Sequence, residues 1–143
     1  MVRRLQLILA LALVLVLTLA GAGRAAGPTQ EECDLGGFDS PAKLTSLIAN
    51  LQKAVKSGDK AAVAALVDYP ITVKLGGAER DIENQADFIK NYDAIMTKPV
   101  RDAVLSFKMK DYFINRQGLT MSDDTGKGSI WLMNNKIYKI EQE

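Results

Sequence analysis

An apolar N-terminal segment constrains the fold of this 143-residue chain more than any other feature. Arg3 and Arg4 precede an almost unbroken apolar run over residues 7–20, which ends in the small residues of 20–22. A positive start, an apolar centre and a small-x-small end are the three parts of a secretory signal peptide. We therefore expect residues 1–26 to be a signal peptide, and the remaining chain of roughly 120 residues to form one domain.

Export would place this domain in the periplasm or outside the cell. The apolar stretch 5–23 approaches the roughly 20 residues that span a bilayer, so the domain would be anchored to the membrane if the segment were not cleaved. The arginine pair also fits a twin-arginine signal, but Gln6 occupies a position where that signal has an apolar residue. We expect ordinary secretion, with cleavage after Ala22 or a few residues later, and no membrane contact after cleavage.

Removal of the segment changes the charge balance of the chain. Arg3 and Arg4 lie within it and all 17 acidic residues follow it, so cleavage after Ala22 leaves 16 basic residues and a net charge of about −1. A near-neutral domain with scattered lysines and arginines lacks the basic surface that nucleic acids and anionic membranes attract. We therefore expect no nucleic-acid partner.

The chain contains one cysteine, Cys33, and no histidine. A single cysteine cannot form an internal disulfide, so we expect Cys33 to be a free thiol in a mobile N-terminal arm, or else to pair with another chain. Without histidine the chain lacks the commonest metal ligand and the commonest general base, and serine–histidine or cysteine–histidine catalysis is excluded. We expect no metal and no cofactor, and any acid–base chemistry would have to use Asp, Glu, Tyr or Lys.

Helical periodicity dominates the first half of the mature chain. Residues 27–39 are polar and rich in turn formers, and we interpret them as a linker. Ser40 is a plausible N-cap with Pro41 at the first helical position, and apolar residues recur at helical spacing until Gly58, which predicts the helix end. The further helices that we expect cover residues 60–67, 84–98 and 101–105.

Alternating apolar and polar residues over 71–75 predict a strand with one buried face. Gly76 and Gly77 form a turn signal, and residues 79–82 are expected to return as its partner. The later strands that we expect cover residues 106–110, 112–115, 119–121, 129–133 and 136–140. Helices first, then a hairpin and a helix, then antiparallel strands predict an α+β domain over residues 40–143.

Three local stretches, together with this order of elements, resemble small exported bacterial members of the nuclear transport factor 2-like superfamily. These stretches are 51–59 (LQKAVKSGD), 67–71 (VDYPI) and 128–132 (GSIWL). The resemblance covers residues 40–140 and implies a cone, in which three N-terminal helices pack on a strongly curved, mostly antiparallel sheet around a pocket. None of the stretches is a catalytic motif, and the superfamily includes isomerases, dehydratases, epoxide hydrolases and non-enzymatic binders, so the resemblance does not imply one function.

Six residues could line the pocket of such a cone or bind its ligand. They are Tyr69, Arg80, Phe88, Tyr92, Tyr112 and Trp131. Each has a structural alternative: Tyr92 lies on an apolar helix stripe, Trp131 could cover an outer sheet face, and Arg80 could be solvated. No residue is assigned a catalytic role, and the Asp123–Thr125 segment resembles a calcium loop but lacks the ligand spacing of an EF-hand.

These observations leave three functional hypotheses. The first is a non-catalytic binding module for a small apolar or amphipathic ligand, or for a protein partner. The alternative is a histidine-free isomerase, dehydratase or hydrolase that uses a buried Asp and Tyr in the cone, a pairing of which ketosteroid isomerase is an example. The third is a structural or inhibitory protein that associates through the outer face of its sheet, which includes a homodimer formed through the sheet.

Overall fold

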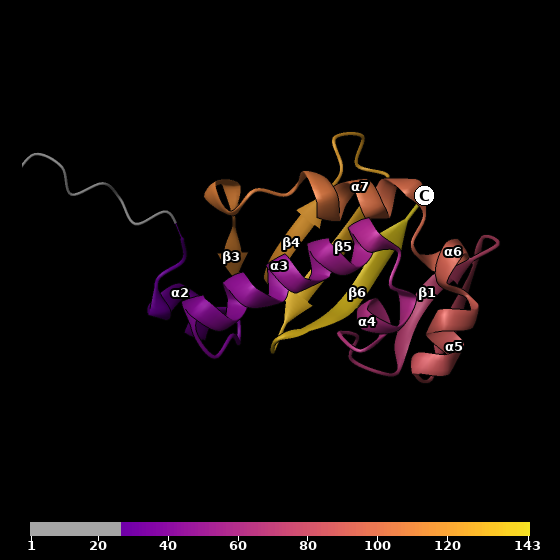
Figure 1. The fold of residues 1–143 in the computed structure, drawn as a ribbon, viewed down its shortest axis with the longest axis horizontal. Coiled ribbons are helices and arrows are strands. Elements are labelled where there is room, and N and C mark those ends of the chain that lie inside the picture. The colour runs from indigo at the N-terminus through magenta and orange to yellow at the C-terminus, as the bar shows by residue number, and fades with distance from the viewer. Residues whose placement is uncertain (1–26) are drawn as a thin grey trace, which may run out of the picture.

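The computed structural model describes residues 27–143, so the predicted signal peptide lies outside the described residues. The described residues form six α-helices, one 3-10 helix and six strands (Figure 1), which confirms the predicted α+β class. The helices are α2 (Gln30–Leu35), α3 (Pro41–Ser57), α4 (Lys60–Ala64), α5 (Gln85–Lys90), α6 (Tyr92–Ile95), α7 (Lys98–Ser106) and the 3-10 helix η1 (Met109–Asp111). The strands are β1 (Ile71–Leu75), β2 (Ala78–Ile82), β3 (Ile114–Asn115), β4 (Gly118–Ser122), β5 (Gly128–Met133) and β6 (Lys136–Gln142). Within residues 27–143, no helix has the length and apolar character needed to cross a bilayer.

The strands form two antiparallel sheets instead of one continuous sheet. One is the β1–β2 hairpin, and the other has the order β3-β4-β5-β6. The hairpin lies beside the edge strand β6 (Figure 1), and the chain just before β1 makes a parallel bridge from Val67 to Ile137. The cone shape implied by the family resemblance stays a prediction.

The core lies between α7 and one face of the four-stranded sheet. In β5, Ile130 and Leu132 are fully buried on this face, whereas Ser129 and Trp131 are half-exposed on the other. Helix α7 lies very close to β5, because a Cβ atom on Gly128 would be 2.3 Å from the carbonyl carbon of Pro99. The helices therefore cover the sheet face that carries the isoleucines and leucines, and α3, which packs against α7, adds six buried residues to the same core.

The predicted boundaries of α3 are confirmed by its caps. The Ser40 hydroxyl accepts a hydrogen bond from the Lys43 amide at 3.2 Å, and Pro41 occupies the first turn. Gly58 ends the helix with a φ of 69°, a left-handed conformation that glycine adopts without strain. The Asp59 carboxylate then caps α4 by accepting from the Ala62 amide at 3.0 Å.

The stretch that we interpreted as a linker contains helix α2. Thr29 and Glu32 form a capping box, in which each side chain accepts a hydrogen bond from the backbone N–H of the other. Cys33 is a free thiol as expected, but it is fully buried in the core instead of lying in a mobile arm. The linker interpretation was wrong here because a helix of only six residues carries no visible periodicity.

Three further element predictions need correction. The helix expected over 84–98 is divided into α5 and α6 at Asn91, whose side-chain amide donates to the Asp87 carbonyl oxygen at 2.9 Å. Pro99 does not end this segment as predicted, because α6 ends at Ile95 and Pro99 lies in the first turn of α7. Helix α7 is longer than the single turn expected over 101–105. The strand expected over 106–110 is absent, because these residues finish α7 and enter η1.

Candidate binding groove beside strand β6

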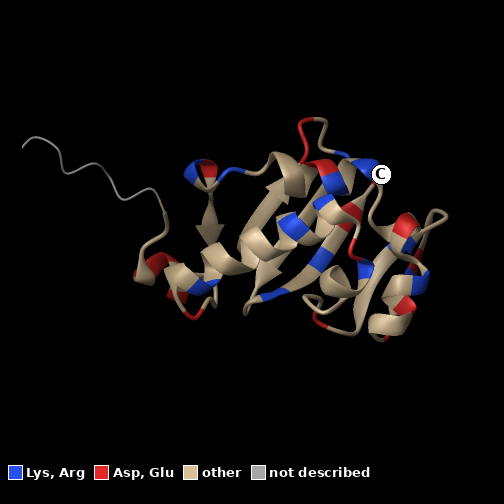
Figure 2. Ribbon diagram, in the orientation of Figure 1, with Lys and Arg blue, Asp and Glu red and all other residues tan. Residues whose placement is uncertain are grey.

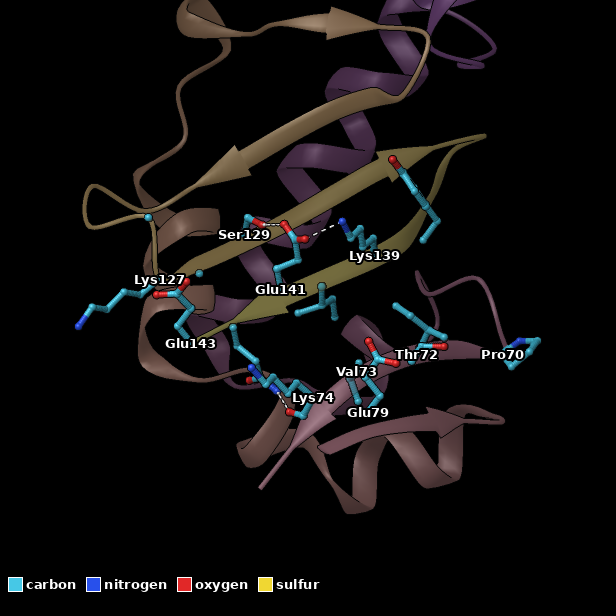
Figure 3. Close-up of a pocket in the computed structure, with 16 residues that line it drawn as sticks. Pro70, Thr72, Val73, Lys74, Glu79, Lys127, Ser129, Lys139, Glu141 and Glu143 are labelled. Carbon is cyan, nitrogen blue, oxygen red and sulfur yellow. Dashed lines mark hydrogen bonds and ion pairs between the residues drawn. The ribbon is translucent and has the colours of Figure 1, made fainter. Parts of the chain in front are cut away.

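A surface groove of about 690 Å³ lies between β1 and β6 (Figure 3). Its lining consists of residues 70–74, Glu79, residues 126–129 and residues 138–143, and we call it the β1–β6 groove. Its volume lies within the range of roughly 300–1,000 Å³ that is usual for ligand pockets. The groove is therefore large enough to hold a ligand.

The groove exists because the chain pairs with β6 just before β1, whereas β1 itself forms no ladder with β6. The Ile137 amide donates to the Leu66 carbonyl oxygen and the Asp68 amide donates to the Ile137 carbonyl oxygen, both at 2.8 Å. Beyond Ile137 a β-bulge interrupts the pairing of β5 with β6, and bulges bend the strand that carries the extra residue. No ladder joins β1 to β6 after this point, and at the far end the Gln142 side-chain amide donates to the Lys74 carbonyl oxygen.

A polar cluster on β5 and β6 forms one wall of the groove. The Glu141 carboxylate accepts from the Ser129 hydroxyl at 3.1 Å and from the Trp131 indole N–H at 3.2 Å, and it is ion-paired with Lys139 at 2.6 Å. The Lys139 ammonium also lies 5.3 Å from the centre of the Trp131 ring. The hydrogen bond from Lys139, above all, lowers the pKa of Glu141 below its ordinary value of 4.5. Glu141 is therefore a fixed negative charge and a poor general base.

The remaining charges of the groove are not neutralised within the described residues. Lys74, Glu79, Lys127 and Glu143 all line it, and none of them takes part in an ion pair with another described residue. Both signs are also interspersed over the rest of the ribbon (Figure 2). The groove thus offers two free ammonium groups and two free carboxylates to a ligand.

Three of the six residues predicted as pocket candidates come together in the interior. Phe88 makes edge-to-face contacts with Tyr69 and Tyr92, with ring centres 6.3 and 6.0 Å apart. Phe88 is fully buried, Tyr92 is nearly so, and the Tyr69 hydroxyl donates to the Ala64 carbonyl oxygen at 2.7 Å. These rings fill space between the helices and the hairpin, so they act as core residues.

The other three candidates lie apart from this aromatic cluster and from one another. Arg80 is exposed on β2, opposite Val73. The Tyr112 hydroxyl donates to the Glu32 carboxylate at 2.9 Å and holds α2 against the segment before β3. Trp131 lies on the outer sheet face, which is one of the two positions that the sequence left open for it. None of the six candidates lines the β1–β6 groove.

The interior lacks the acid–base pair that the enzyme hypothesis requires. Among the described residues no charged side chain is buried, and Asp93, next to Tyr92, is 82% exposed and ion-paired with Lys60 at 3.1 Å. Burial raises the pKa of Tyr69 to about 12 and also raises the pKa of Tyr92. Both tyrosines therefore stay protonated and uncharged at neutral pH.

Two further sites suggested by the sequence are structural in this fold. The Asp123 carboxylate accepts from the amides of Thr125 at 3.2 Å and Gly128 at 2.8 Å and from the Thr125 hydroxyl, so it closes the β4–β5 turn. Over residues 27–143, no group of three Cys, Asp or Glu side chains is arranged to hold a metal ion.

Burial raises the pKa of the Cys33 thiol, and the negative charges of Asp34 and Glu32 add to this effect. Cys33 is therefore an unreactive core thiol.

The groove residues escaped prediction from the sequence because their position depends on how two sheets meet. We expected a strand over 136–140, whereas β6 continues to Gln142 and carries Glu141 and Gln142 into the groove. After Ile140 the chain ends in a continuous polar run, EQE, which has no alternation to predict a longer strand. No protein-family model matches the chain, and no curated protein is significantly similar to it.

Proposed function

We propose that the protein is a non-catalytic binding module, exported by the cell that makes it, whose ligand occupies the β1–β6 groove. The observation that carries this proposal is a groove of about 690 Å³ with two ammonium groups and two carboxylates that no described residue neutralises. A ligand with charges of both signs would complement them. The filled aromatic interior supports a ligand site on the surface instead of inside the domain.

A binding role is also favoured by the chemistry of the groove. Glu141 is the carboxylate of the groove with the most hydrogen-bond partners, and its three donors favour its ionised state. An enzyme of the isomerase or hydrolase kind needs a carboxylate whose pKa is raised by burial toward neutrality. No arrangement in residues 27–143 supplies such a group, so the enzyme hypothesis gains no support.

Export is proposed from the N-terminal pattern alone. Expression of the full chain in a bacterial host, followed by fractionation and intact-mass measurement, tests it. We expect to find the protein in the exported fraction. Its mass should show that the signal peptide has been cleaved at a position between Ala22 and Ala26. Recovery of the uncleaved chain from the membrane fraction would instead support an anchored protein.

A pair of threonine-to-tryptophan variants tests the location of the ligand site. Thr72 is exposed and lines the groove. Thr45 is also exposed, but it lies on α3 and does not line the groove. We would screen a library of small zwitterionic compounds by amide chemical-shift changes in the exported, mature protein. We expect shifts at groove residues that Thr72→Trp abolishes and Thr45→Trp preserves. Shifts centred on Phe88 and Tyr92, or no binding by any compound, would contradict the proposal.

A homodimer through the sheet is a second candidate, favoured by the outer face of β5. Trp131 is half-exposed there beside Lys139 and Thr120. Native mass spectrometry over a range of protein concentrations tests this association. A dimer that Trp131→Ser weakens would support it, and a monomer at every concentration would count against it.

A further inference from the structure

The backbone of β1 presents free hydrogen-bonding groups to the groove. Gly76 and Gly77 form a two-residue turn with positive φ at both positions, so the residues that flank it, Leu75 and Ala78, are a hydrogen-bonded pair. Hydrogen-bonded and non-hydrogen-bonded pairs alternate along an antiparallel ladder. The backbone N–H and C=O groups of Thr72 and Lys74 therefore face away from β2, toward β6.

The backbone of β6 presents a second free edge to the same groove. The Glu143 amide donates to the Lys127 carbonyl oxygen at 3.0 Å, which fixes the alternation at this end of the β5–β6 pair. Gln142 and Ile140 are then the residues whose N–H and C=O groups face away from β5. No described residue forms a backbone hydrogen bond to these groups or to those of Thr72.

Two edges with free groups are unusual in a folded domain, because an unpaired edge is a template for another strand. Natural edges are normally covered, bulged or blocked by proline. Within residues 27–143, the only hydrogen bond across the middle and far end of the groove runs from the Gln142 side-chain amide to the Lys74 carbonyl oxygen. The oxygen of that side-chain amide, Gln142 Oε1, is buried and accepts no hydrogen bond from another described residue. An acceptor in this state gains a hydrogen bond when a ligand N–H reaches it.

We infer that the occupant of the β1–β6 groove is an extended segment of a partner polypeptide, which adds backbone hydrogen bonds to one of the two free edges. This inference rests on the proposed function and names its class of ligand. A peptide backbone supplies alternating N–H and C=O groups at the two-residue spacing that Ile140 and Gln142 present. Lysine and glutamate side chains of such a segment would complement the free charges of Glu79, Lys74 and their neighbours.

This mode of binding differs from recognition of a small charged molecule in what it needs from the protein. A small zwitterion needs the side-chain charges, whereas an added strand needs the outward backbone N–H groups of Thr72 and Gln142. Proline removes such an N–H and is tolerated on an edge where the group faces away from the ladder. Each proline variant can be matched with an alanine variant, which removes the same side chain and keeps the N–H.

The experiment starts from a displayed library of random peptides of about eight residues, long enough to cover the edge with flanking residues. Peptides that bind the exported, mature protein would be measured against Gln142→Pro, Gln142→Ala, Thr72→Pro and Thr72→Ala. We expect at least one of the proline variants to weaken binding by about tenfold. A tenfold loss corresponds to the upper end of the free energy that a single hydrogen bond contributes. Thr72→Ala should bind within about threefold of the parent protein, because its backbone groups are unchanged. Gln142→Ala should lose only the bond that the Gln142 side-chain oxygen makes, and should therefore bind more tightly than Gln142→Pro, which loses the backbone N–H as well.

A second form of each selected peptide separates backbone pairing from side-chain contact. Methylation of alternate peptide nitrogens on the edge-facing side removes the N–H groups and keeps every side chain. We expect this form to lose binding by at least about tenfold. Equal binding of the methylated form, or equal effects of proline and alanine, would overturn the inference.

The outcome also distinguishes this inference from the proposed function. If the library yields no binder while zwitterionic compounds bind in a manner sensitive to Thr72→Trp, the groove is a ligand site but not a peptide site. If neither peptides nor small compounds bind the groove, both proposals are wrong. Peptides whose binding shifts map to the outer face around Trp131 would contradict the peptide inference and favour association through that face.

Discussion

Strand β6 meets two very different environments along its length. On its inner face Ile137 and Ile140 are buried with the other apolar residues of the core, whereas Lys139 and Glu141 lie on the exposed face. One edge of β6 pairs with β5 from Lys136 to Gln142, but the other edge pairs only at Ile137. The same strand therefore closes the core on one side and leaves a groove on the other.

This difference between the two sides of β6 indicates where the domain can bind a ligand. Its interior is occupied by buried apolar and aromatic side chains, and changes there are expected to alter stability. The β1–β6 groove contains free charges and free backbone edges, and changes there are expected to alter binding with little effect on folding.

A pair of phenylalanine variants gives the largest contrast between interior and surface. Phe88 is fully buried in the aromatic cluster with Tyr69 and Tyr92, whereas Phe113 is 69% exposed. We expect Phe88→Ala to lower the free energy of unfolding by about 3–5 kcal/mol, because it removes a buried ring and leaves a cavity. Phe113→Ala should change it by less than about 0.5 kcal/mol. Urea denaturation measures both, and similar losses would show that the interior is not filled as described.

A pair of glycine variants tests the contact between α7 and the sheet. A Cβ atom at Gly128 would meet the backbone of Pro99 and Val100 at 2.3 and 2.4 Å, so Gly128→Ala must move the helix or the strand. We expect a loss on the order of 3 kcal/mol in the free energy of unfolding. Gly126 has open space around it and a φ of 71°, so Gly126→Ala should cost only about 1–2 kcal/mol from backbone strain. Equal losses in the two variants would contradict the close approach of α7.

Much of the fold was predictable because the relevant signals are local. Ser40, Pro41, Gly58 and Asp59 specify their helix ends through their own backbone and side-chain chemistry, and each acts as predicted. The alternation over 71–75 likewise gave β1 with its observed bounds. Helix α2 was missed although the Thr29-x-x-Glu32 capping-box signature is present in the sequence, because the helix is too short for an apolar stripe.

The candidate site was much less predictable, because it depends on tertiary geometry. Aromatic residues were favoured as pocket residues, yet Phe88 and Tyr92 are core residues and Trp131 lies beside the groove without lining it. The residues that line the groove are ordinary lysines and glutamates. They gain significance only because the chain that leads into β1 stops pairing with β6 after Ile137, which no local sequence pattern shows.

The smallest expected effect concerns the polar cluster on the outer face of β5 and β6. Because Lys139 and the two other donors lower the pKa of Glu141, ionisation of this carboxyl favours the folded state. Its contribution to stability is present above the ordinary pKa of 4.5 and is lost as the pH falls through the lowered value. The side chain is half-exposed, so Glu141→Gln should change the free energy of unfolding at neutral pH by less than about 1 kcal/mol.

Fluorescence makes this small effect measurable, because Trp131 is the only tryptophan and donates directly to Glu141. We expect the emission of Trp131 to change as the pH falls below 4.5, when the carboxylate is protonated and releases its donors. Glu141→Gln should remove this transition. Glu143→Gln, which alters a neighbouring groove carboxylate that makes no bond to Trp131, should preserve it. A transition that survives in Glu141→Gln would show that Trp131 senses another group, and the outer face would then lack the fixed charge that distinguishes it from the core.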